Sequence, residues 1–419
     1  MTDSGPSSRL NRRQFGLRVA AASAAILGVG AAGTGEWLHA KHKGQLKYAM
    51  DPNVAGANSL QAHAAVKGLV YGASVNPLLL DVEGVAEGHT EDGYTQLVMA
   101  QTGMLVDEFA TYWKWMRPSP DTFKFKNLDR LMGFAELTGK KVRGHVLVWH
   151  YAMPGWFGKV ATKQNARELL VNHIRTVVGR LKGLIDTWDV VNEAIEPMDG
   201  RADGLRKSPW LELIGPDYIE LAFRTSAEAD PNAKLAYNDY GIETDLPRDA
   251  KKRDFVLALL ERLKASGTPI HAVGVQSHLF AAAGEPGPGL QSFIRETAKM
   301  GLEAHISELD VSFMRMKGGA ADRDATVARV YKDYLNLVLA EPNVPLVITW
   351  GITDAHTWLR SAVLFMPFST RRLWARIIVG LRERPLPFDD EFAAKPAFWA
   401  MRTAFDEARP RGLAAGLNC

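Results

Sequence analysis

The sequence predicts an α/β protein that folds as a single (β/α)8 barrel. Short apolar runs alternate with longer stretches of helical periodicity, and eight such runs follow one another past residue 60. Continuous apolar strands separated by helices are typical of parallel sheets that are covered on both faces. Eight units of this kind fit a closed barrel. An open doubly wound sheet is the alternative, but we find no glycine-rich phosphate loop that would favour it.

The predicted strands define the boundaries of the domain. Helical patterns lie between them, as in residues 251–265, and we find neither a long linker nor a repeat of fixed period. We therefore expect one barrel domain over residues 66–419, preceded by an extension over 41–65 and carrying an insertion at about 359–384, after the eighth strand. The eight strands are predicted at Leu69–Val75, Met104–Phe109, Val142–Trp149, Ile185–Asn192, Lys234–Tyr240, Ala272–His278, Ala304–Val311 and Leu346–Ile352.

Charge and cysteine content exclude several classes of function. The formal net charge of the 419 residues is +3. Residues 1–40 contribute +2 of it, because four arginines stand there against one aspartate and one glutamate. The rest of the chain is nearly neutral, whereas nucleic-acid binding needs a concentrated basic surface, so we expect no nucleic-acid partner. Cys419 is the only cysteine, which excludes an internal disulfide and a cysteine-based metal site. We predict no metal site and a monomer.

The first forty residues have the order of an export signal. A polar, basic stretch ends at Arg12-Arg13-Gln14-Phe15, and a weakly apolar run follows from Val19 to Ala32. That run is shorter than the roughly 20 apolar residues that span a bilayer. The arginine pair resembles the twin-arginine signal of bacteria, which predicts a periplasmic or secreted protein. An uncleaved signal that anchors the protein to a membrane is the alternative.

Polar and aromatic residues gather where the predicted strands end. In a parallel barrel all carboxyl ends of the strands converge on one face, and active sites lie there. We therefore expect residues that are far apart in the sequence to line one pocket. They are Glu108, His145, Trp149, His150, Asn192, Glu193, Asn238, Tyr240, Gln276, His278, Glu308, Asp310 and Trp350.

Two of these residues, Glu193 and Glu308, point to a reaction. They end or follow strands four and seven, on opposite sides of the barrel mouth, where two carboxylates would flank a bound substrate. Glycoside hydrolysis requires this arrangement, because one group protonates the leaving oxygen while the other attacks or positions water at the anomeric carbon. His278 and Asp310 are predicted to form a hydrogen-bonded chain to Glu308. Flat apolar faces for stacking sugar rings come from Trp149, Trp350 and Trp358.

Six motifs together resemble glycoside hydrolase family 10, which consists chiefly of endo-β-1,4-xylanases. The resemblance runs from about residue 66 to the C-terminus. It implies a (β/α)8 barrel, a polysaccharide substrate, retention of anomeric configuration, no cofactor, Glu193 as acid/base and Glu308 as nucleophile. It also implies sugar contacts from His145, Trp149, Asn192, Gln276, His278 and Trp350. The motifs are Arg143–His150, Trp188–Ala194, Asn238–Tyr240, Gln276–His278, Ile306–Val311 and Trp350–Asp354.

The second predicted strand departs from the family pattern. The family usually carries Glu-Asn-Glu-Met-Lys-Trp there, and its Glu, Asn and Lys bind sugar on the non-reducing side. Here Glu108 and Trp113 remain, but Phe109 replaces the Asn and Tyr112 replaces the Lys. Each lost polar contact is worth about 1–3 kcal/mol. Two alternatives to xylan hydrolysis therefore stay open: the same chemistry on another β-linked polysaccharide, and a glycan-binding barrel that has lost turnover.

Overall fold

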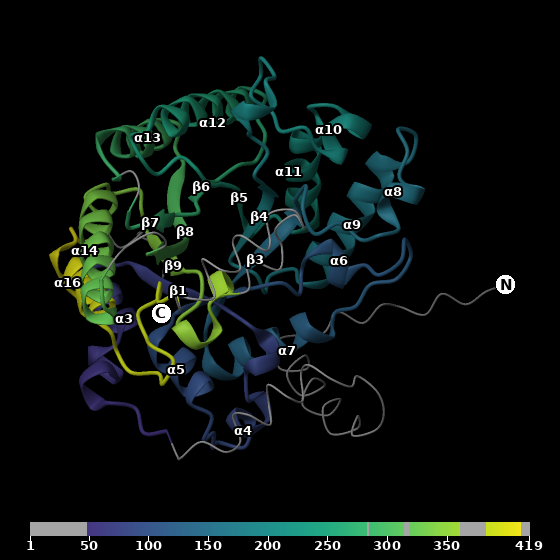
Figure 1. The fold of residues 1–419 in the computed structure, drawn as a ribbon. Coiled ribbons are helices and arrows are strands. Elements are labelled where there is room, and N and C mark those ends of the chain that lie inside the picture. The colour runs from purple at the N-terminus through teal and green to yellow at the C-terminus, as the bar shows by residue number, and fades with distance from the viewer. Residues whose placement is uncertain (1–47, 283–284, 314–317, 361–382, 412–419) are drawn as a thin grey trace.

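The computed structural model describes residues 48–282, 285–313, 318–360 and 383–411. Within them, eight parallel strands close into a ring, because β1 pairs with both β2 and β9 while β6 pairs with β8. Figure 1 looks onto this ring, with the helices around its outside. The predicted (β/α)8 barrel is confirmed. The strands of the ring are β1 Val70–Val75, β2 Met104–Asp107, β3 Lys141–Val148, β4 Thr187–Asn192, β5 Lys234–Asp239, β6 Ala272–Val275, β8 Glu303–Ser312 and β9 Leu346–Thr349.

Each connection between neighbouring strands of the ring contains a helix that covers the outside of the sheet (Figure 1). These helices are α5 Gly93–Gln101, α7 Lys126–Thr138, α9 Ala166–Arg180, α11 Tyr218–Ala229, α12 Pro247–Ala265, α13 Pro288–Lys299 and α14 Ala320–Leu339. After β9, α16 (Pro396–Glu407) packs against both α14 and α3 (Leu60–Val66). Shorter helices lie in the loops: α4 Val82–Ala86, α6 Trp113–Met116, α8 Phe157–Val160 and α10 Pro209–Ile214.

The sixth predicted strand is divided in the structure. The apolar pattern predicts one strand over Ala272–His278, whereas β6 ends at Val275 and a separate strand β7 (His278–Phe280) follows. The break lies at Ser277, whose φ of 66° is outside the extended region. The short strand β7 then pairs with the upper part of β8, with His278 opposite Asp310. This second pairing brings the two residues together at the barrel mouth.

The barrel core begins ahead of residue 66. Leu60 and Ala64 of α3 are fully buried, and α3 packs against β1 and α16. Ser59 caps this helix by accepting a hydrogen bond from the amide of Ala62. Part of the predicted N-terminal extension therefore belongs to the barrel.

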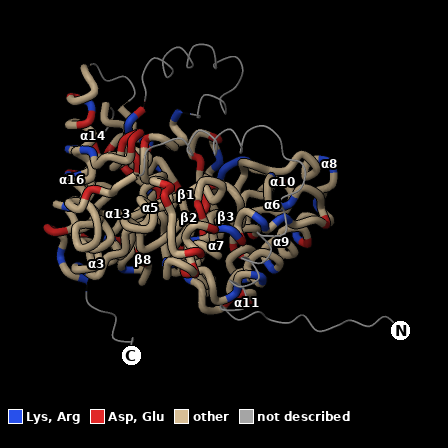
Figure 2. The backbone as a smooth tube through the Cα atoms, turned by 90° about the horizontal axis from the view of Figure 1, so that it is seen from below, with Lys and Arg blue, Asp and Glu red and all other residues tan. Residues whose placement is uncertain are grey.

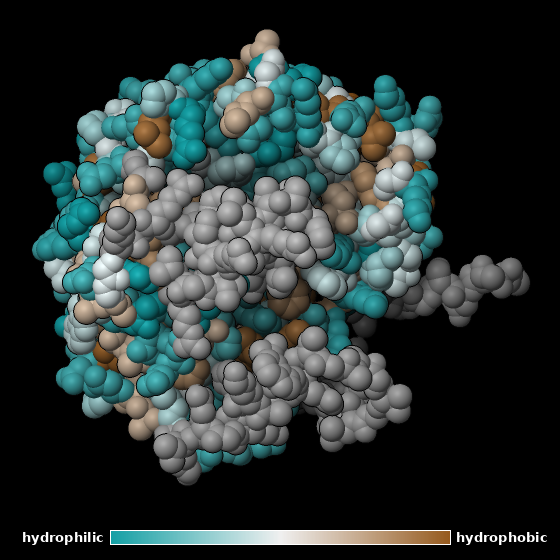
Figure 3. Space-filling view, viewed as in Figure 1, coloured by the Kyte–Doolittle hydropathy of each residue, from teal (hydrophilic) through white to brown (hydrophobic). Residues whose placement is uncertain are grey.

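Two predicted segments lie outside the described residues. These are the export signal over residues 1–40 and most of the insertion at 359–384, of which residues 361–382 are not described. Among the residues that are described, no helix combines the length and the apolarity needed to cross a membrane. The face seen in Figure 3 carries mostly hydrophilic residues around the grey atoms. Lysines and arginines are interspersed with aspartates and glutamates around the molecule in Figure 2.

The barrel interior depends on a close approach between β3 and β4. Gly144 pairs with Trp188, and a Cβ atom added at Gly144 would lie 2.1 Å from Cε3 of that indole. Trp188 is fully buried, so it has no room to move away. Only glycine fits at this position of β3.

We predict that Gly144→Ala lowers the free energy of unfolding by about 1–3 kcal/mol, which is typical of an overpacked core. The measurement is chemical denaturation followed by tryptophan fluorescence. Gly179→Ala in α9 is the matched control, because the added Cβ would have no atom within 4 Å outside the local backbone of its own helix. It is expected to be neutral or stabilising by up to about 1 kcal/mol, since alanine favours the helix. Equal stability of the two variants would contradict this account of β3.

Candidate active site

The two predicted glutamates lie at the carboxyl ends of strands that are separated around the ring. Glu193 directly follows β4, and Glu308 lies in the upper half of β8. Both side chains are largely buried, with exposed fractions of 12% for Glu193 and 7% for Glu308. The backbone of Glu193 has a φ of 56°, and its N–H donates a 2.8 Å hydrogen bond to the carbonyl of Asn238. Left-handed backbone at a non-glycine residue is uncommon and gathers at functional sites.

The side chains of Asn192 and Asn238 connect the two carboxylates. Asn238 Nδ2 donates to Glu308 Oε1 at 2.7 Å and to Asn192 Oδ1 at 2.9 Å. Asn192 Nδ2 in turn donates to Glu193 Oε1 at 3.2 Å. The two amides therefore form a hydrogen-bonded bridge from one glutamate to the other.

Neighbouring strands hold this amide bridge in place. Gln276, which follows β6, donates its Nε2 to Asn192 Oδ1 at 3.1 Å and to Glu193 Oε1 at 3.2 Å. Ser307 Oγ donates to Asn238 Oδ1 at 2.6 Å and so fixes which way that amide points. Gly274 makes room for the amide, because an added Cβ would lie 1.9 Å from Asn238 Oδ1. The strands β4, β5, β6 and β8 thus share one polar network.

A histidine and an aspartate position the other oxygen of Glu308. His278 Nε2 lies 3.1 Å from Glu308 Oε2, and His278 Nδ1 lies 3.1 Å from Asp310 Oδ1. Trp358 Nε1 donates to the second oxygen of Asp310 at 2.7 Å. Burial alone would lower the pKa of His278, but the charges of Asp310 and Glu308 hold it well above its usual value. The His278 ring therefore lies between the carboxylates of Glu308 and Asp310.

His145 is held by a buried ion pair below the pocket. Its Nδ1 lies 3.0 Å from Asp189 Oδ2, and the same carboxylate accepts from Arg143 Nε at 3.0 Å. Burial would raise the pKa of Asp189, but the Arg143 guanidinium lowers it to about 2. Burial would likewise lower the pKa of His145, but the bond to Asp189 and the charge of Glu308, 4.0 Å away, leave it raised.

Aromatic rings surround these groups. Trp350 lies edge-on to His145 with ring centroids 5.1 Å apart, and Trp358 lies 5.2 Å from His278. Tyr112 contacts His145 at 5.9 Å and Trp149 at 5.3 Å, both edge-on. Rings in these positions offer apolar faces to a sugar, whose C–H groups stack on them.

The remaining predicted residues, Glu108, His150 and Tyr240, have other partners. Burial raises the pKa of Glu108 to about 7, and the charge of Asp107 adds to this. His150 lies 3.9 Å from Glu193, and burial lowers its pKa to about 4, so it is neutral. The hydroxyl of Tyr240 accepts a hydrogen bond from Arg206 at 3.0 Å, and the ammonium of Lys252 lies 3.9 Å from the ring centroid.

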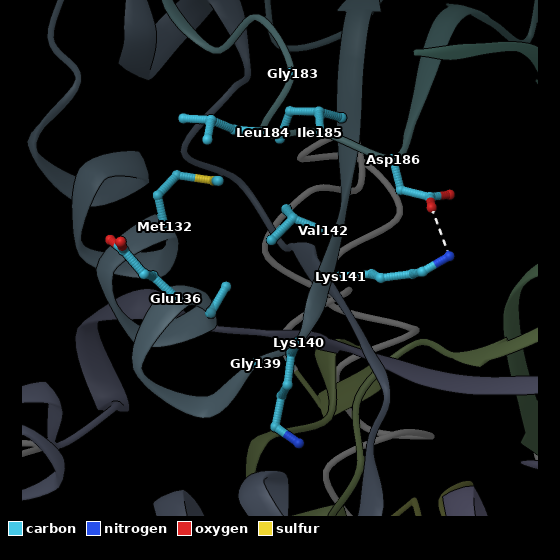
Figure 4. A pocket seen from close by; sticks show the side chains of 11 residues that line it. Met132, Glu136, Gly139, Lys140, Lys141, Val142, Gly183, Leu184, Ile185 and Asp186 are labelled. Atoms are coloured by element: carbon cyan, nitrogen blue, oxygen red, sulfur yellow. Dashed lines mark ion pairs between the residues drawn. The ribbon is translucent and has the colours of Figure 1, made fainter. Parts of the chain in front are cut away.

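A cavity lies at the opposite end of the barrel, away from Glu193 and Glu308. It has a volume of about 470 Å³ and lies where β3 and β4 begin. In Figure 4, Lys141 pairs with Asp186 across it, and the ammonium of Lys140 also bonds the carbonyl of Met99 at 2.8 Å. Lys140, Lys141 and Asp186 in its lining are thus paired with protein atoms rather than directed at a ligand. Within the residues that the structure describes, no group of three or more histidines or carboxylates is arranged to hold a metal ion.

Comparison with known proteins identifies this architecture. The family model of glycosyl hydrolase family 10 matches residues 59–404, which is most of the chain. The chain belongs to glycosyl hydrolase family 10. The match begins at Ser59, the residue that caps α3, so the family domain and the observed barrel begin at the same place.

Several relatives of this family 10 member are described as xylanases. The chain is 35% identical over 314 residues to a β-1,4-xylanase of Dictyoglomus thermophilum, covering 73% of this chain and 83% of that one. It is 38% identical to endo-1,4-β-xylanase A of Thermotoga maritima over 67% of this chain, but spans only 25% of that relative. Xylanase 10B of Thermotoga petrophila, solved with xylobiose, superposes with a TM-score of 0.71 at 29% identity, covering 83% of this chain and 97% of that one.

Two features of this family 10 site were not predicted from the sequence. Asp189 was not singled out, although a buried aspartate in an apolar strand is a signal that it has a partner. Tyr112 was noted only as a departure from the family pattern, and no pattern in the sequence predicts its contacts with His145 and Trp149. The pairing of Asp189 with Arg143 joins β4 to β3 and depends on the register between the two strands.

We predict that Asp310→Asn lowers the pKa of His278, because one of the two charges that stabilise the imidazolium is removed. The measurement is the titration of the His278 ring followed by NMR. Asp333→Asn, an exposed aspartate of α14, is the control and should leave the titration unchanged. An unchanged titration midpoint in Asp310→Asn would show that Asp310 does not stabilise the charged ring.

Proposed function

We propose that this family 10 glycoside hydrolase is a retaining endo-β-1,4-xylanase, with Glu193 as acid/base and Glu308 as nucleophile. The observation that carries the proposal is the amide bridge, which holds two buried carboxylates in one pocket at the barrel mouth. The similarity to xylanases of Dictyoglomus and Thermotoga supports xylan as the substrate.

The first step uses the different surroundings of the two glutamates. Burial raises the pKa of Glu193, and the charge of Asp239 adds to this, although the Trp149 indole favours the ionised form. A protonated Glu193 gives its proton to the glycosidic oxygen as that bond breaks. Glu308, oriented by Asn238 and His278, attacks the anomeric carbon and forms a covalent glycosyl-enzyme.

The second step reverses these roles. Glu193, now ionised, takes a proton from water as the water oxygen attacks the anomeric carbon. Glu308 leaves as a carboxylate, so two inversions give net retention. Asn192 bonds to both Glu193 and Asn238, between the two carboxylates of the amide bridge, which suits it to meet the 2-hydroxyl of the sugar.

We predict that Glu308→Gln lowers kcat on xylan by more than about a thousandfold, because an amide cannot act as the nucleophile. In Glu193→Ala, we expect the bond-breaking step to keep its rate on aryl xylosides with good leaving groups. Azide should restore turnover of the variant by replacing water. The measurements are reducing ends from xylan and nitrophenol from aryl xylosides.

Glu303→Gln is the matched control for this pair of variants. It lies at the start of the same strand β8 and pairs with Lys234, at the end of the barrel away from the pocket. It should keep the wild-type rate. A Glu308→Gln variant with the wild-type rate would refute the assignment of the nucleophile.

Hydrolysis of another β-linked polysaccharide is the second candidate function. Phe109 and Tyr112 favour it, since they replace the family's amide and ammonium on the non-reducing side. Incubation with xylan and with a panel of other β-linked polysaccharides separates the two candidates, with Glu308→Gln as the blank. Faster release of reducing ends from another polymer than from xylan would favour the second.

We also propose that the protein is exported through the twin-arginine route. The support is the sequence of residues 1–40, in which Arg12 and Arg13 precede an apolar run. We predict that Arg12→Lys combined with Arg13→Lys keeps the protein in the cytoplasm of a bacterial host. Cell fractionation followed by immunoblotting measures this. An Arg9→Lys variant is the control, and export of the double variant at the wild-type level would contradict the proposal.

A further inference from the structure

One turn of the chain directs a side chain to each of the two glutamates. Gln276 Nε2 donates to Glu193 Oε1 at 3.2 Å. Two residues later, His278 Nε2 lies 3.1 Å from Glu308 Oε2. Ser277 stands between them with a φ of 66°, at the break that separates β6 from β7 (Figure 1). We call residues 276–278 the Ser277 turn. A displacement of this turn would move a partner of each glutamate at once.

The Ser277 turn needs support from its surroundings. Left-handed backbone is unfavourable for a serine, and it persists only where neighbouring groups hold it. The amide of the fully buried Ser277 donates to Glu243 Oε1 at 3.0 Å, and its Oγ donates to the Val275 carbonyl at 2.9 Å. Since the serine proton is used in that bond, the hydroxyl of Tyr334 on α14 donates to Ser277 Oγ at 2.5 Å. Glu243 therefore holds the backbone of the turn, and Tyr334 holds its side chain.

Glu243 lies in the loop after β5 and is itself held in place. It is 4% exposed, and its second oxygen accepts from the amide of Ile242 at 2.8 Å. Arg253 of α12 donates to the carbonyls of Ile242 and Thr244, which stand on either side of Glu243 in the chain. The loop is thereby bonded to a helix on the outside of the barrel. A carboxylate on such a loop can keep the amide of a strained residue in one position.

We propose that Glu243 is a positioning residue for the hydrolytic reaction, which acts by holding the left-handed backbone of Ser277. Through this one bond it keeps Gln276 against the acid/base and His278 against the nucleophile. The inference rests on the proposed function, since it concerns the same two glutamates. Loss of Glu243 would misplace groups that act in the transition state, so kcat is expected to fall more than KM rises.

The first test removes the carboxylate of the full-length protein and uses xylohexaose, whose leaving group needs the acid. We expect Glu243→Ala to lower kcat by about tenfold to a hundredfold, while KM changes by less than about threefold. The titration midpoint of the His278 ring, measured by NMR, should fall because the ring leaves two carboxylates. Glu243→Gln keeps an oxygen for the Ser277 amide, so its kcat should stay within about threefold of the wild-type value.

The second test changes the strained residue itself. Glycine adopts left-handed backbone about as readily as right-handed backbone. Adding Ser277→Gly to Glu243→Ala should therefore restore the turn without the carboxylate. We expect kcat to rise about tenfold over the single variant, and the His278 midpoint to return toward the wild-type value. A carboxylate that only stabilised the fold would not be replaced in this way.

Asp230→Ala is the matched control. Asp230 is also fully buried, and its carboxylate accepts from the backbone amides of Gly183 and Asn232, at the end of the barrel away from the pocket. This variant should lower the free energy of unfolding, measured by chemical denaturation, and leave kcat and the His278 midpoint unchanged.

Tyr334→Phe covers the case in which Glu243→Ala does not fold. It removes the other support of Ser277 and keeps the shape of the side chain. We expect kcat to fall by about threefold and the His278 midpoint to fall as well. Wild-type values of both quantities in Tyr334→Phe would then overturn the proposal.

Three results with a folded Glu243→Ala would also overturn it. They are a wild-type kcat, a loss of kcat with the His278 midpoint unchanged, and no gain of kcat when Ser277→Gly is added. Failure of the proposed function is seen separately, because the wild type would then release no more reducing ends than the Glu308→Gln blank. The NMR titration does not depend on turnover, so it would still test whether Glu243 positions His278.

Discussion

The candidate site depends on the hydrogen bond between two asparagines. Asn192 and Asn238 lie at the ends of adjacent strands, and each amide also bonds one of the two carboxylates. An amide has a donor end and an acceptor end, so a chain of amides has a direction. Ser307 sets that direction by donating to Asn238 Oδ1. The separation and orientation of the two glutamates are therefore fixed by strands that need not move during the reaction.

Burial of so many charges is tolerated because almost every one has a partner. Asp189 lies between Arg143 and His145, and His278 lies between Asp310 and Glu308. An isolated charge in this interior would cost several kcal/mol. Glu193 differs, because its hydrogen bonds come from the amides of Asn192 and Gln276 and burial raises its pKa. The two glutamates therefore differ in their partners, which are amides for Glu193 and both an amide and an imidazole for Glu308.

The order of strands and helices could be predicted because each parallel strand is covered on both faces and must be apolar throughout. The residues at the strand ends could be placed together for the same reason, since a closed ring brings those ends to one face. The break at Ser277 could not be predicted, because a serine in a left-handed conformation leaves no mark in an apolar pattern. The partner of His145 could not be predicted either, as it depends on the register between β3 and β4.

The replacement of the family's lysine by Tyr112, in the loop after β2, changes the surroundings of Glu108. Replacing an ammonium by Tyr112 leaves Glu108 with no ion pair among the described residues, and burial raises its pKa to about 7. A carboxyl that is partly protonated at neutral pH binds sugar hydroxyls less firmly than one held ionised by a lysine. The pocket gains ring contacts in exchange, because Tyr112 packs against both His145 and Trp149. We therefore expect recognition on this side to depend less on charge and more on stacking.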